Sequence, residues 1–473
     1  MFKFISNIYN YVKFIYRVNK FYNLSLTKDI NDEDINRFIK ILLPTIKKCG
    51  CVCIKFCQWV TPIFDIIYNT DKTDKTEGIN WLKTLETFYE NCPEHSLNYT
   101  FKIYSNDFNE KFNDIYELID MVGSGSIGQV YKIKHRKSQI YYAMKTIHPD
   151  IHYEMKLFKN IINILLFIPY TKNIIYNVLP IDIYKFISLI EQQSDMIHES
   201  NNLLQMKEYY KGNSMVIIPE LIRCSHNIMI MSYEDGIDID ASDKSDYEKM
   251  KIIVLLYLFS RYNFEYKNFN HADLHKGNWK ITQGNKLLVY DFGYCFALEN
   301  IKIIKYIAGA FIDTDNENGT INLEMLFIEV LNVKLDSNKK FIKGYIDTYI
   351  DIGKYICCPE IILKHIFIIS KHLNIIIIPQ LIQAIIVQIQ NQKYLTNYFI
   401  NNKLEDYPNG DNIYRNDYLD YYTICKTYNI FPEMQEYFKT ILNKKQVEVN
   451  GLFDILDKTS YITEDIKQLL TFD

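Results

Sequence analysis

The chain has 473 residues, more than a single hydrophobic core usually organises, so two lobes or domains are expected. Hydrophobic residues make up 48% of the chain, charged residues 23%, and the net charge is −4, which excludes the strong basic excess of a nucleic-acid-binding protein. Ten cysteines in a chain of this length favour a reduced, intracellular protein over a small disulfide-rich secreted one.

The N-terminal segment combines positive charge with an apolar helical face. No acidic residue precedes Asp29, and Lys13, Arg17 and Lys20 gather beside a face of Ile, Tyr and Val residues between positions 5 and 16. This pattern is typical of a helix at a membrane surface or of an organelle-targeting segment, and the alternative is a helix docked on the body of the protein. Helical spacing resumes after Asn31, so the sequence predicts an N-terminal helical region.

A less regular part follows this helical region. Polar residues over Asn69–Gly78 predict a loop, a helix is expected over Ile79–Tyr89, and the stretch to about Phe112 has no clear period. The period then changes to that of short strands, and helices return after it. The predicted elements are three antiparallel strands at Ile115–Val122, Gln129–His135 and Tyr141–Ile147, a helical region at Asp182–Tyr210, and strands at Met215–Ile218 and Ile228–Ser232.

Helices dominate the chain beyond Gly236, interrupted by the segment His271–Gly293. The most apolar part, Ile361–Gln390, contains lysine, histidine and proline, which favours a buried or amphipathic helix over a membrane span.

A glycine-rich loop lies between the first two predicted strands. It reads Gly123, Ser124, Gly125, Ser126, Ile127, Gly128, Gln129 and Val130. Glycines allow backbone N–H groups to approach phosphate oxygens closely. A dinucleotide-binding turn has the same glycine spacing but opens a helix, whereas a strand follows here, which favours the loop of a protein kinase.

Three further motifs complete a candidate ATP site. Lys145, on the next predicted strand, could reach the α and β phosphates, and Glu199 on the following helix is its expected partner. Asp273 and Asn278 have the five-residue spacing of a kinase catalytic loop, and Asp291 opens an Asp-Phe-Gly motif. Asp273 is the candidate catalytic carboxylate, and Asn278 and Asp291 are the candidate Mg²⁺ ligands. The order and placement of the four motifs predict a nucleotide-binding kinase-like site.

The chain departs from ordinary protein kinases in a way that resembles the UbiB/ADCK family of atypical kinases. No Ala-Pro-Glu motif follows Asp291, and a helical segment with Lys55, Phe56, Cys57 and Gln58 precedes the strands. Over roughly Lys40–Leu298 the motifs resemble that family, whose members are associated with coenzyme Q biosynthesis and membrane lipid metabolism. The resemblance implies that Lys55 and Gln58 fold over the active site and restrict access to it.

The resemblance also shows substitutions at family positions. A family aspartate four residues before the helix glutamate maps to Asp195, which joins Lys55 and Gln58 in the gating motif, but the glutamate of the same motif is replaced by Gln193. Cys57 replaces a glycine, and an alanine-rich stretch in the family is replaced here by Gly123–Gly125. Losing the carboxylate weakens any coupling of position 193 to Lys55 or to a metal.

The sequence therefore predicts an α+β, bilobal protein-kinase-like fold with a small β-rich N-lobe and a large helical C-lobe. The expected divisions are an N-terminal helical extension over 1–111, an N-lobe over 112–235 and a C-lobe with C-terminal helices over 236–473. ATP and Mg²⁺ are the expected cofactors, and a membrane lipid or an isoprenoid or quinone-like molecule is the candidate further ligand. The resemblance implies a mitochondrial location, and the sequence does not specify an oligomeric state.

Two other functions remain open at this point. One is a protein serine/threonine kinase, against which the missing Ala-Pro-Glu motif and the helix with Lys55 and Gln58 argue. The other is a non-catalytic, nucleotide-binding pseudokinase scaffold, against which the retention of all five site residues argues: Lys145, Glu199, Asp273, Asn278 and Asp291.

Overall fold

The computed structural model describes residues 2–27, 32–69, 92, 94–312, 316–350, 359–401, 425–426, 430–436 and 439. Its helices are α1 Phe2–Thr27, α2 Asp32–Cys49, α3 Cys51–Asn69, α5 Leu97–Phe108, α6 Phe112–Ile115, α7 Ile151–Phe167, α8 Pro169–Val178, α9 Ile183–Gln193, α10 Met196–Tyr209, α11 Asp246–Tyr262, η1 Asn263–Lys267, η2 Lys276–Asn278, α12 Ile301–Ile312, α13 Asn316–Val330, α14 Asp336–Tyr349, α16 Pro359–Leu373 and α17 Pro379–Asn401. Its strands are β1 Tyr116–Ser124, β2 Gly128–His135, β3 Tyr141–Ile147, β4 Val216–Ile217, β5 Leu221–Cys224, β6 Ile228–Ser232, β7 Asn270–His271, β8 Trp279–Ile281, β9 Leu287–Val289 and β10 Cys295–Phe296.

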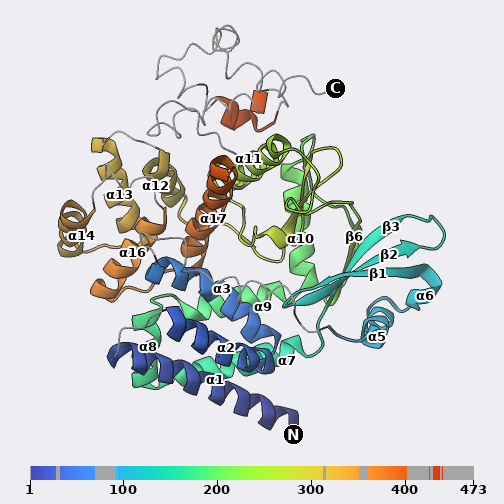
Figure 1. Ribbon diagram of the computed structural model, residues 1–473, viewed down its shortest axis with the longest axis horizontal. Helices are drawn as coiled ribbons and strands as arrows, with labels where there is room; N and C mark the ends of the chain where they lie inside the picture. Colours follow the sequence, from blue (N-terminus) through green and yellow to red (C-terminus); the bar gives the residue numbers. More distant parts are fainter. Residues whose placement is uncertain are drawn as a thin grey trace.

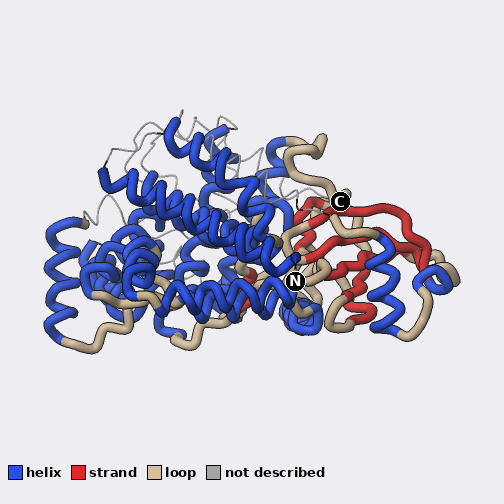
Figure 2. The backbone as a smooth tube through the Cα atoms, turned by 90° about the horizontal axis from the view of Figure 1, so that it is seen from below, coloured by secondary structure: helices blue, strands red, loops and turns tan. Residues whose placement is uncertain are grey.

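One antiparallel sheet gathers the strands of the small lobe. Its order is β1-β2-β3-β6-β5, and α5 and α6 lie beside it at the right of Figure 1. Figure 2 shows the same division, with most strands at one end of the molecule and helices filling the rest. The predicted α+β class and the three predicted antiparallel strands are confirmed, and β5 joins the sheet as a strand that the sequence did not indicate.

Gly128 fixes the pairing of β2 with β3. It lies opposite Ile147, and a Cβ at this position would come within 2.7 Å of the carbonyl oxygen of Thr146. No side chain fits such a close approach of two backbones. The last glycine of the loop is therefore required by the sheet itself.

The helical part contains elements that the sequence predicted and others that it did not. The predicted N-terminal helical region contains α1, α2 and α3, and the region over Asp182–Tyr210 contains α9 and α10. The stretch before Phe112, predicted to be irregular, contains α5, which Ser96 caps by accepting the N–H of Tyr99. The prediction was wrong there because aromatic and β-branched residues lower helix propensity, whereas α5 forms by packing Tyr104 against the sheet.

Two hydrophobic clusters hold the described residues together. The smaller one joins α5 and α6 to one face of the sheet and centres on Tyr104, Phe112 and Tyr131. The larger one is continuous from the N-terminal helices through the helical lobe, and it includes Val52 and Ile63 of α3 and Phe367 of α16. Packing therefore joins α3 to the helical lobe and α5 to the sheet, while the domain boundaries at 111 and 235 stay predictions.

The most apolar segment, Ile361–Gln390, forms parts of two helices, α16 and α17, with many buried residues. Among the described residues, no single helix has the length and apolar composition of a membrane span. Only α7 and α8 taken together reach that composition, and they are bent by 104° where they meet. The loop expected over Asn69–Gly78 is described only at Asn69, which ends α3, and the helix expected over Ile79–Tyr89 lies outside the described residues.

Candidate active site

The glycine-rich loop connects β1 to β2. The N–H of Gly125 donates to the carbonyl oxygen of Gly128 at 2.9 Å, which closes the turn. A Cβ added at Gly123 would meet no atom within 4 Å, so the space beside this glycine is open. Because Gly128 is required by strand pairing and the N–H of Gly125 is bonded to its carbonyl oxygen, Gly123 is the glycine beside which a phosphate would find open space.

Lys145 lies on β3 opposite Val130 and contacts two carboxylates. Its Nζ is 2.9 and 2.8 Å from the two carboxylate oxygens of Glu199 on α10, and 2.9 Å from Oδ1 of Asp291. The pairing of Lys145 with Glu199 predicted from the sequence is present. Burial alone would lower the pKa of Lys145, but the charges of Asp291 and Glu199 outweigh it and raise that pKa, so the side chain remains an ammonium.

The two carboxylates around Lys145 differ in environment. The side chain of Glu199 is 1% exposed, and burial raises its pKa against the opposing charge of Lys145. The side chain of Asp291 is 40% exposed, and Lys145 lowers its pKa although burial opposes this. Glu199 is therefore placed to hold Lys145, and Asp291 is the carboxylate that a ligand from solvent could reach.

Asp291 has an unusual backbone conformation, with φ +63°. Non-glycine residues in this region are uncommon and cost free energy, and they occur often at functional sites. Its neighbours fix the turn, because Asn202 donates to the carbonyl oxygen of Phe292 at 2.9 Å and the N–H of Tyr290 donates to the carbonyl oxygen of Asn278 at 3.0 Å. The last bond brings the segments with Asn278 and Asp291 together.

Asp273 lies on the catalytic-loop segment between β7 and η2. The side-chain amide nitrogen of Asn278 donates to the backbone carbonyl oxygen of Asp273 at 2.8 Å. The backbone N–H of Asp273 donates to Nδ1 of the buried His271 at 3.3 Å. Burial would raise the pKa of Asp273, but the charges of Lys55 and His275 outweigh it and place that pKa well below its ordinary value. Asp273 is therefore an ionised carboxylate at neutral pH.

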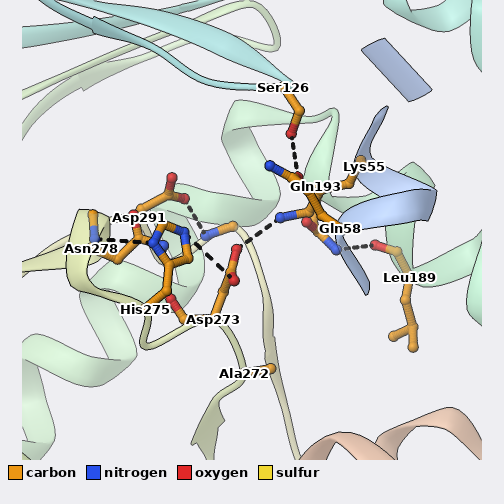
Figure 3. Close-up of polar contacts among 12 residues, drawn as sticks. Lys55, Gln58, Ser126, Leu189, Gln193, Ala272, Asp273, His275, Asn278 and Asp291 are labelled. Carbon is orange, nitrogen blue, oxygen red and sulfur yellow. Dashed lines mark hydrogen bonds and ion pairs between the residues drawn. The ribbon is translucent and has the colours of Figure 1, made fainter. Parts of the chain in front are cut away.

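Helix α3 brings two further residues to this site. Nζ of Lys55 is 2.8 Å from Oδ2 of Asp273, and the hydroxyl of Ser126 in the glycine-rich loop donates to Oε1 of Gln58 at 3.0 Å. Figure 3 shows Lys55 and Gln58 on one side of Asp273, with Asn278 and Asp291 on the other. One helix from the N-terminal region thus contacts both the loop of the small lobe and the catalytic loop of the large lobe.

The remaining family positions have local contacts. The amide of Gln193 donates to the carbonyl oxygen of Leu189 in its own helix at 3.2 Å. Asp195 accepts the N–H of Ile197 at 2.9 Å, which caps α10, and it lies 3.1 Å from Nδ1 of His226. Asp195 therefore supports the start of the helix that carries Glu199, and its part in gating stays a prediction.

Sequence reasoning missed a histidine pair beneath the glycine-rich loop. Nε2 of His148 lies 2.8 Å from the carbonyl oxygen of Gly125, and Nδ1 of His148 lies 2.8 Å from Nδ1 of His95. Thr100 contacts Nε2 of His95 at 2.9 Å. Burial and the neighbouring His148 lower the pKa of His95 to about 4, so the pair is neutral at pH 7. Neither histidine belongs to a motif, and only the folded chain brings them together.

The predicted ligands of Mg²⁺ are Asn278 and Asp291. Among the described residues, no group of three or more His, Cys, Asp or Glu side chains is placed to hold a metal ion. A site for Mg²⁺ needs fewer protein ligands, because this ion usually binds one or two protein groups together with substrate phosphates and water. Asp291 and the amide oxygen of Asn278 have the chemistry for such a site.

Comparisons with known proteins agree with the kinase-like arrangement. The family model of the ABC1 atypical kinase-like domain matches residues 87–320. A probable serine/threonine-protein kinase abkC from Dictyostelium discoideum is 26% identical over 50% of this chain and 34% of its own length. A probable protein kinase UbiB from Providencia stuartii is 26% identical over 39% of this chain and 34% of its own length. The chain thus matches about a third of the length of each relative.

A solved structure, the complex of Rv3197 with erythromycin from Mycobacterium tuberculosis, aligns with a TM-score of 0.40 and 15% identity. The alignment covers 59% of this chain and 83% of that chain.

Proposed function

Since residues 87–320 place this chain in the UbiB/ADCK family of atypical kinases, we propose that it is an Mg²⁺-dependent, ATP-binding phosphotransferase or ATPase linked to lipid or quinone metabolism at a membrane. The observation that carries the proposal is the contact of Lys145 with both Glu199 and Asp291. Burying an ammonium and two carboxylates costs desolvation free energy that their pairing only partly offsets, and such charge clusters gather at active sites.

The residues of the small lobe would bind the nucleotide. Gly123 has open space beside its backbone, and Lys145 would bind the α and β phosphates while Glu199 holds its side chain in position. The buried Glu199 is 1% exposed, so the pair is fixed before a ligand arrives. This arrangement would position the phosphates without reorganisation of the protein.

Asp291 and Asn278 would hold the metal ion. Asp291 is partly exposed, and the amide nitrogen of Asn278 is engaged by the carbonyl oxygen of Asp273, which directs the amide oxygen to other partners. The ion would neutralise charge on the phosphates. Asp273, ionised and next to these ligands, would orient the group that attacks the γ-phosphoryl.

A second function is favoured by one observation, the ion pair of Lys55 with Asp273. The lysine side chain is 14% exposed and occupies the carboxylate that a substrate hydroxyl would use. A chain that keeps this pair after nucleotide binding would be a nucleotide-binding pseudokinase scaffold without turnover.

Phosphate release measured with and without liposomes tests the proposed function. We expect Mg²⁺-dependent release by the wild-type chain, stimulated by lipid, and a loss of about 100-fold or more in Lys145→Met and Asp291→Asn. Asp336→Asn, an exposed aspartate outside the site, is the matched control. Tight nucleotide binding without release would favour the scaffold, and transfer to a protein substrate would favour a serine/threonine kinase. Unchanged Mg²⁺-dependent nucleotide binding by Asp291→Asn would overturn the assignment of the metal ligand.

A further inference from the structure

A second concave site lies between α1 and α2. Figure 1 shows these two helices at the lower edge of the molecule. The two helices are antiparallel: Asn10 donates to the carbonyl oxygen of Lys48 at 3.1 Å, and the rings of Phe21 and Phe38 stack with centroids 4.0 Å apart. Between these contacts lies a cavity of about 250 Å³. None of the active-site residues lines it.

The cavity is positively charged. Lys13, Arg17 and Lys48 line it, and no acidic residue is among the described residues that do so. Helix α1 itself contains no Asp or Glu. Three cations facing one space repel each other, and a bound anion would remove that repulsion. The charge distribution therefore fits a negatively charged ligand.

Arg17 is already held in place for such a ligand. Its Nη1 donates to the carbonyl oxygen of Ile41 at 2.7 Å and contacts the hydroxyl of Thr45, which is buried. Both contacts use Nη1 and anchor the guanidinium group to α2, and Nε and Nη2 are its further donors. A fixed guanidinium group beside two ammonium groups matches the several oxygens of a phosphate.

The size of the cavity limits the ligand. At about 250 Å³ it is smaller than the pockets of about 300–1,000 Å³ that enclose drug-sized molecules, so a single phosphate group fits better than a whole nucleotide.

The outer face of α1 indicates where such a phosphate comes from. Tyr9, Val12 and Tyr16 are 63%, 58% and 63% exposed, and their spacing places them on one face beside Lys13 and Arg17. Exposed aromatic and apolar side chains next to basic ones are typical of helices that lie in the headgroup region of a membrane. We propose that the α1–α2 pocket binds the phosphate of an anionic phospholipid headgroup while Tyr9, Val12 and Tyr16 enter the interface.

Both this proposal and the proposed function place the chain at a membrane, but they involve different residues. Lys13, Arg17 and Lys48 lie on α1 and α2, whereas the nucleotide residues lie on the sheet and the catalytic loop. Vesicle binding measured without nucleotide therefore tests the pocket alone, and loss of ATP turnover would not affect the result.

Co-sedimentation of the full chain with vesicles is the direct test. The vesicles are phosphatidylcholine alone or phosphatidylcholine with phosphatidylglycerol, and the variants are Lys13→Glu/Lys48→Glu and Arg17→Lys. The matched control is Lys102→Glu/Lys137→Glu, which changes the net charge equally at two exposed lysines of the small lobe. Thermal unfolding confirms that each variant is folded.

We expect binding only to phosphatidylglycerol-containing vesicles. The partition coefficient should fall at least about 30-fold in the pocket variant, since each lysine near an anionic surface contributes roughly fivefold. Arg17→Lys should show an intermediate loss of vesicle binding, because lysine keeps the positive charge but lacks the paired donors of the guanidinium group. Equal losses in the pocket and control variants, or no loss in either, would overturn the proposal.

A soluble-phosphate arm distinguishes the source of the ligand. Inorganic phosphate, compared with chloride at equal ionic strength, is added to the wild-type and pocket-variant chains, both carrying Lys145→Met to weaken the nucleotide site. If phosphate raises the unfolding temperature only when Lys13 and Lys48 are present, and the chain binds no vesicles, the pocket binds an anion that is not a lipid headgroup. That result would overturn the proposed lipid source. Vesicle binding lost in the pocket variant alone supports the lipid source.

Discussion

Lys55 and Asp273 are 218 positions apart in the chain, and their ion pair joins the N-terminal region to the catalytic loop. The pair stabilises the ionised form of Asp273, because a positive charge at 2.8 Å opposes the effect of burial on its pKa. Lys55 thus has two effects at once: it keeps the carboxylate ionised and it occupies one of its oxygens.

Replacing Lys55 by methionine separates these effects. Without the positive charge of Lys55, the effect of burial is less strongly opposed and the pKa of Asp273 rises, so a larger fraction of the carboxyl is protonated in acidic solution. As the pH is lowered, any activity that depends on Asp273 then declines at a higher pH than in the wild type. At neutral pH the activity rises, because Lys55 no longer occupies the carboxylate. The pH profile of phosphate release in wild type, Lys55→Met and the exposed-lysine control Lys102→Met measures this. An unchanged acid limb in Lys55→Met would contradict the role of the ion pair.

At the residue scale, the sequence predicted contacts that belong to a motif and missed those made only by folding. The pair of Lys145 with Glu199 follows from the need of a buried ammonium for a carboxylate partner, and it is present. The contact of His95 with His148 has no such signal, because each residue alone has the appearance of an ordinary polar residue at the edge of a strand or loop. The sequence also did not indicate which carboxylate Lys55 contacts, since Gln193 has no charge to pair with it.

At the scale of elements, the start of α3 decides where Lys55 and Gln58 point. Glu154 of α7 accepts the N–H of Cys51 at 2.7 Å, which satisfies one donor at the start of α3 and places a negative charge at the positive end of the helix. Gly50 precedes this helix with φ +103°, and a Cβ there would overlap the carboxylate of Glu154. The glycine thus lets α7 approach and orient α3.

The substitution Gly50→Ala tests this element. An alanine at this positive φ costs about 1–2 kcal/mol of backbone strain. Gly212→Ala is the control, because its φ of +81° causes similar strain and no atom lies within 4 Å of the added Cβ. Only Gly50→Ala also displaces the carboxylate of Glu154, and the loss of its hydrogen bond from the N–H of Cys51 should add about 1–3 kcal/mol. Denaturant unfolding of the two variants is expected to show the larger loss of stability for Gly50→Ala. Equal losses would mean that Glu154 moves aside without cost.

Elements with strong local signals were predictable, and elements made by packing were not. The strands β1, β2 and β3 combine β-branched and aromatic residues with a glycine-rich turn, so they were predicted within two residues. The helices α7 and α8 carry apolar residues around much of their circumference, which obscures the helical period. Residues Leu97–Phe108 have a mixed composition, and only burial against the sheet makes α5 a helix.

At the scale of the whole molecule, α3 connects the two lobes. Gln58 accepts the hydroxyl of Ser126 from the glycine-rich loop, and Lys55 contacts Asp273 from the catalytic loop. These two contacts, less than one turn apart on α3, form a bridge across the candidate active site (Figure 3).

Breaking this bridge should loosen the glycine-rich loop. In Lys55→Ala/Gln58→Ala, amide hydrogen exchange over residues 123–128 is expected to accelerate about 30-fold, because the two lost contacts together contribute roughly 2 kcal/mol. The double variant Lys102→Ala/Gln205→Ala removes the same side-chain types at exposed positions. Similar exchange in the two double variants would show that Lys55 and Gln58 do not hold the loop.

The packing of α3 also has a consequence for synthesis of the chain. Helix α3 ends at Asn69, yet it packs against α16, which begins at Pro359. At about 5–20 residues per second, a ribosome needs roughly 15–60 s to make the intervening part. During that interval the apolar face of α3, with Val52, Ile54 and Ile63, has no partner from α16 to cover it. The part of α3 that α16 covers therefore stays exposed on the nascent chain for tens of seconds, even though α2 and α7 can already pack against the helix, and chaperones that act at the ribosome can bind it in that time.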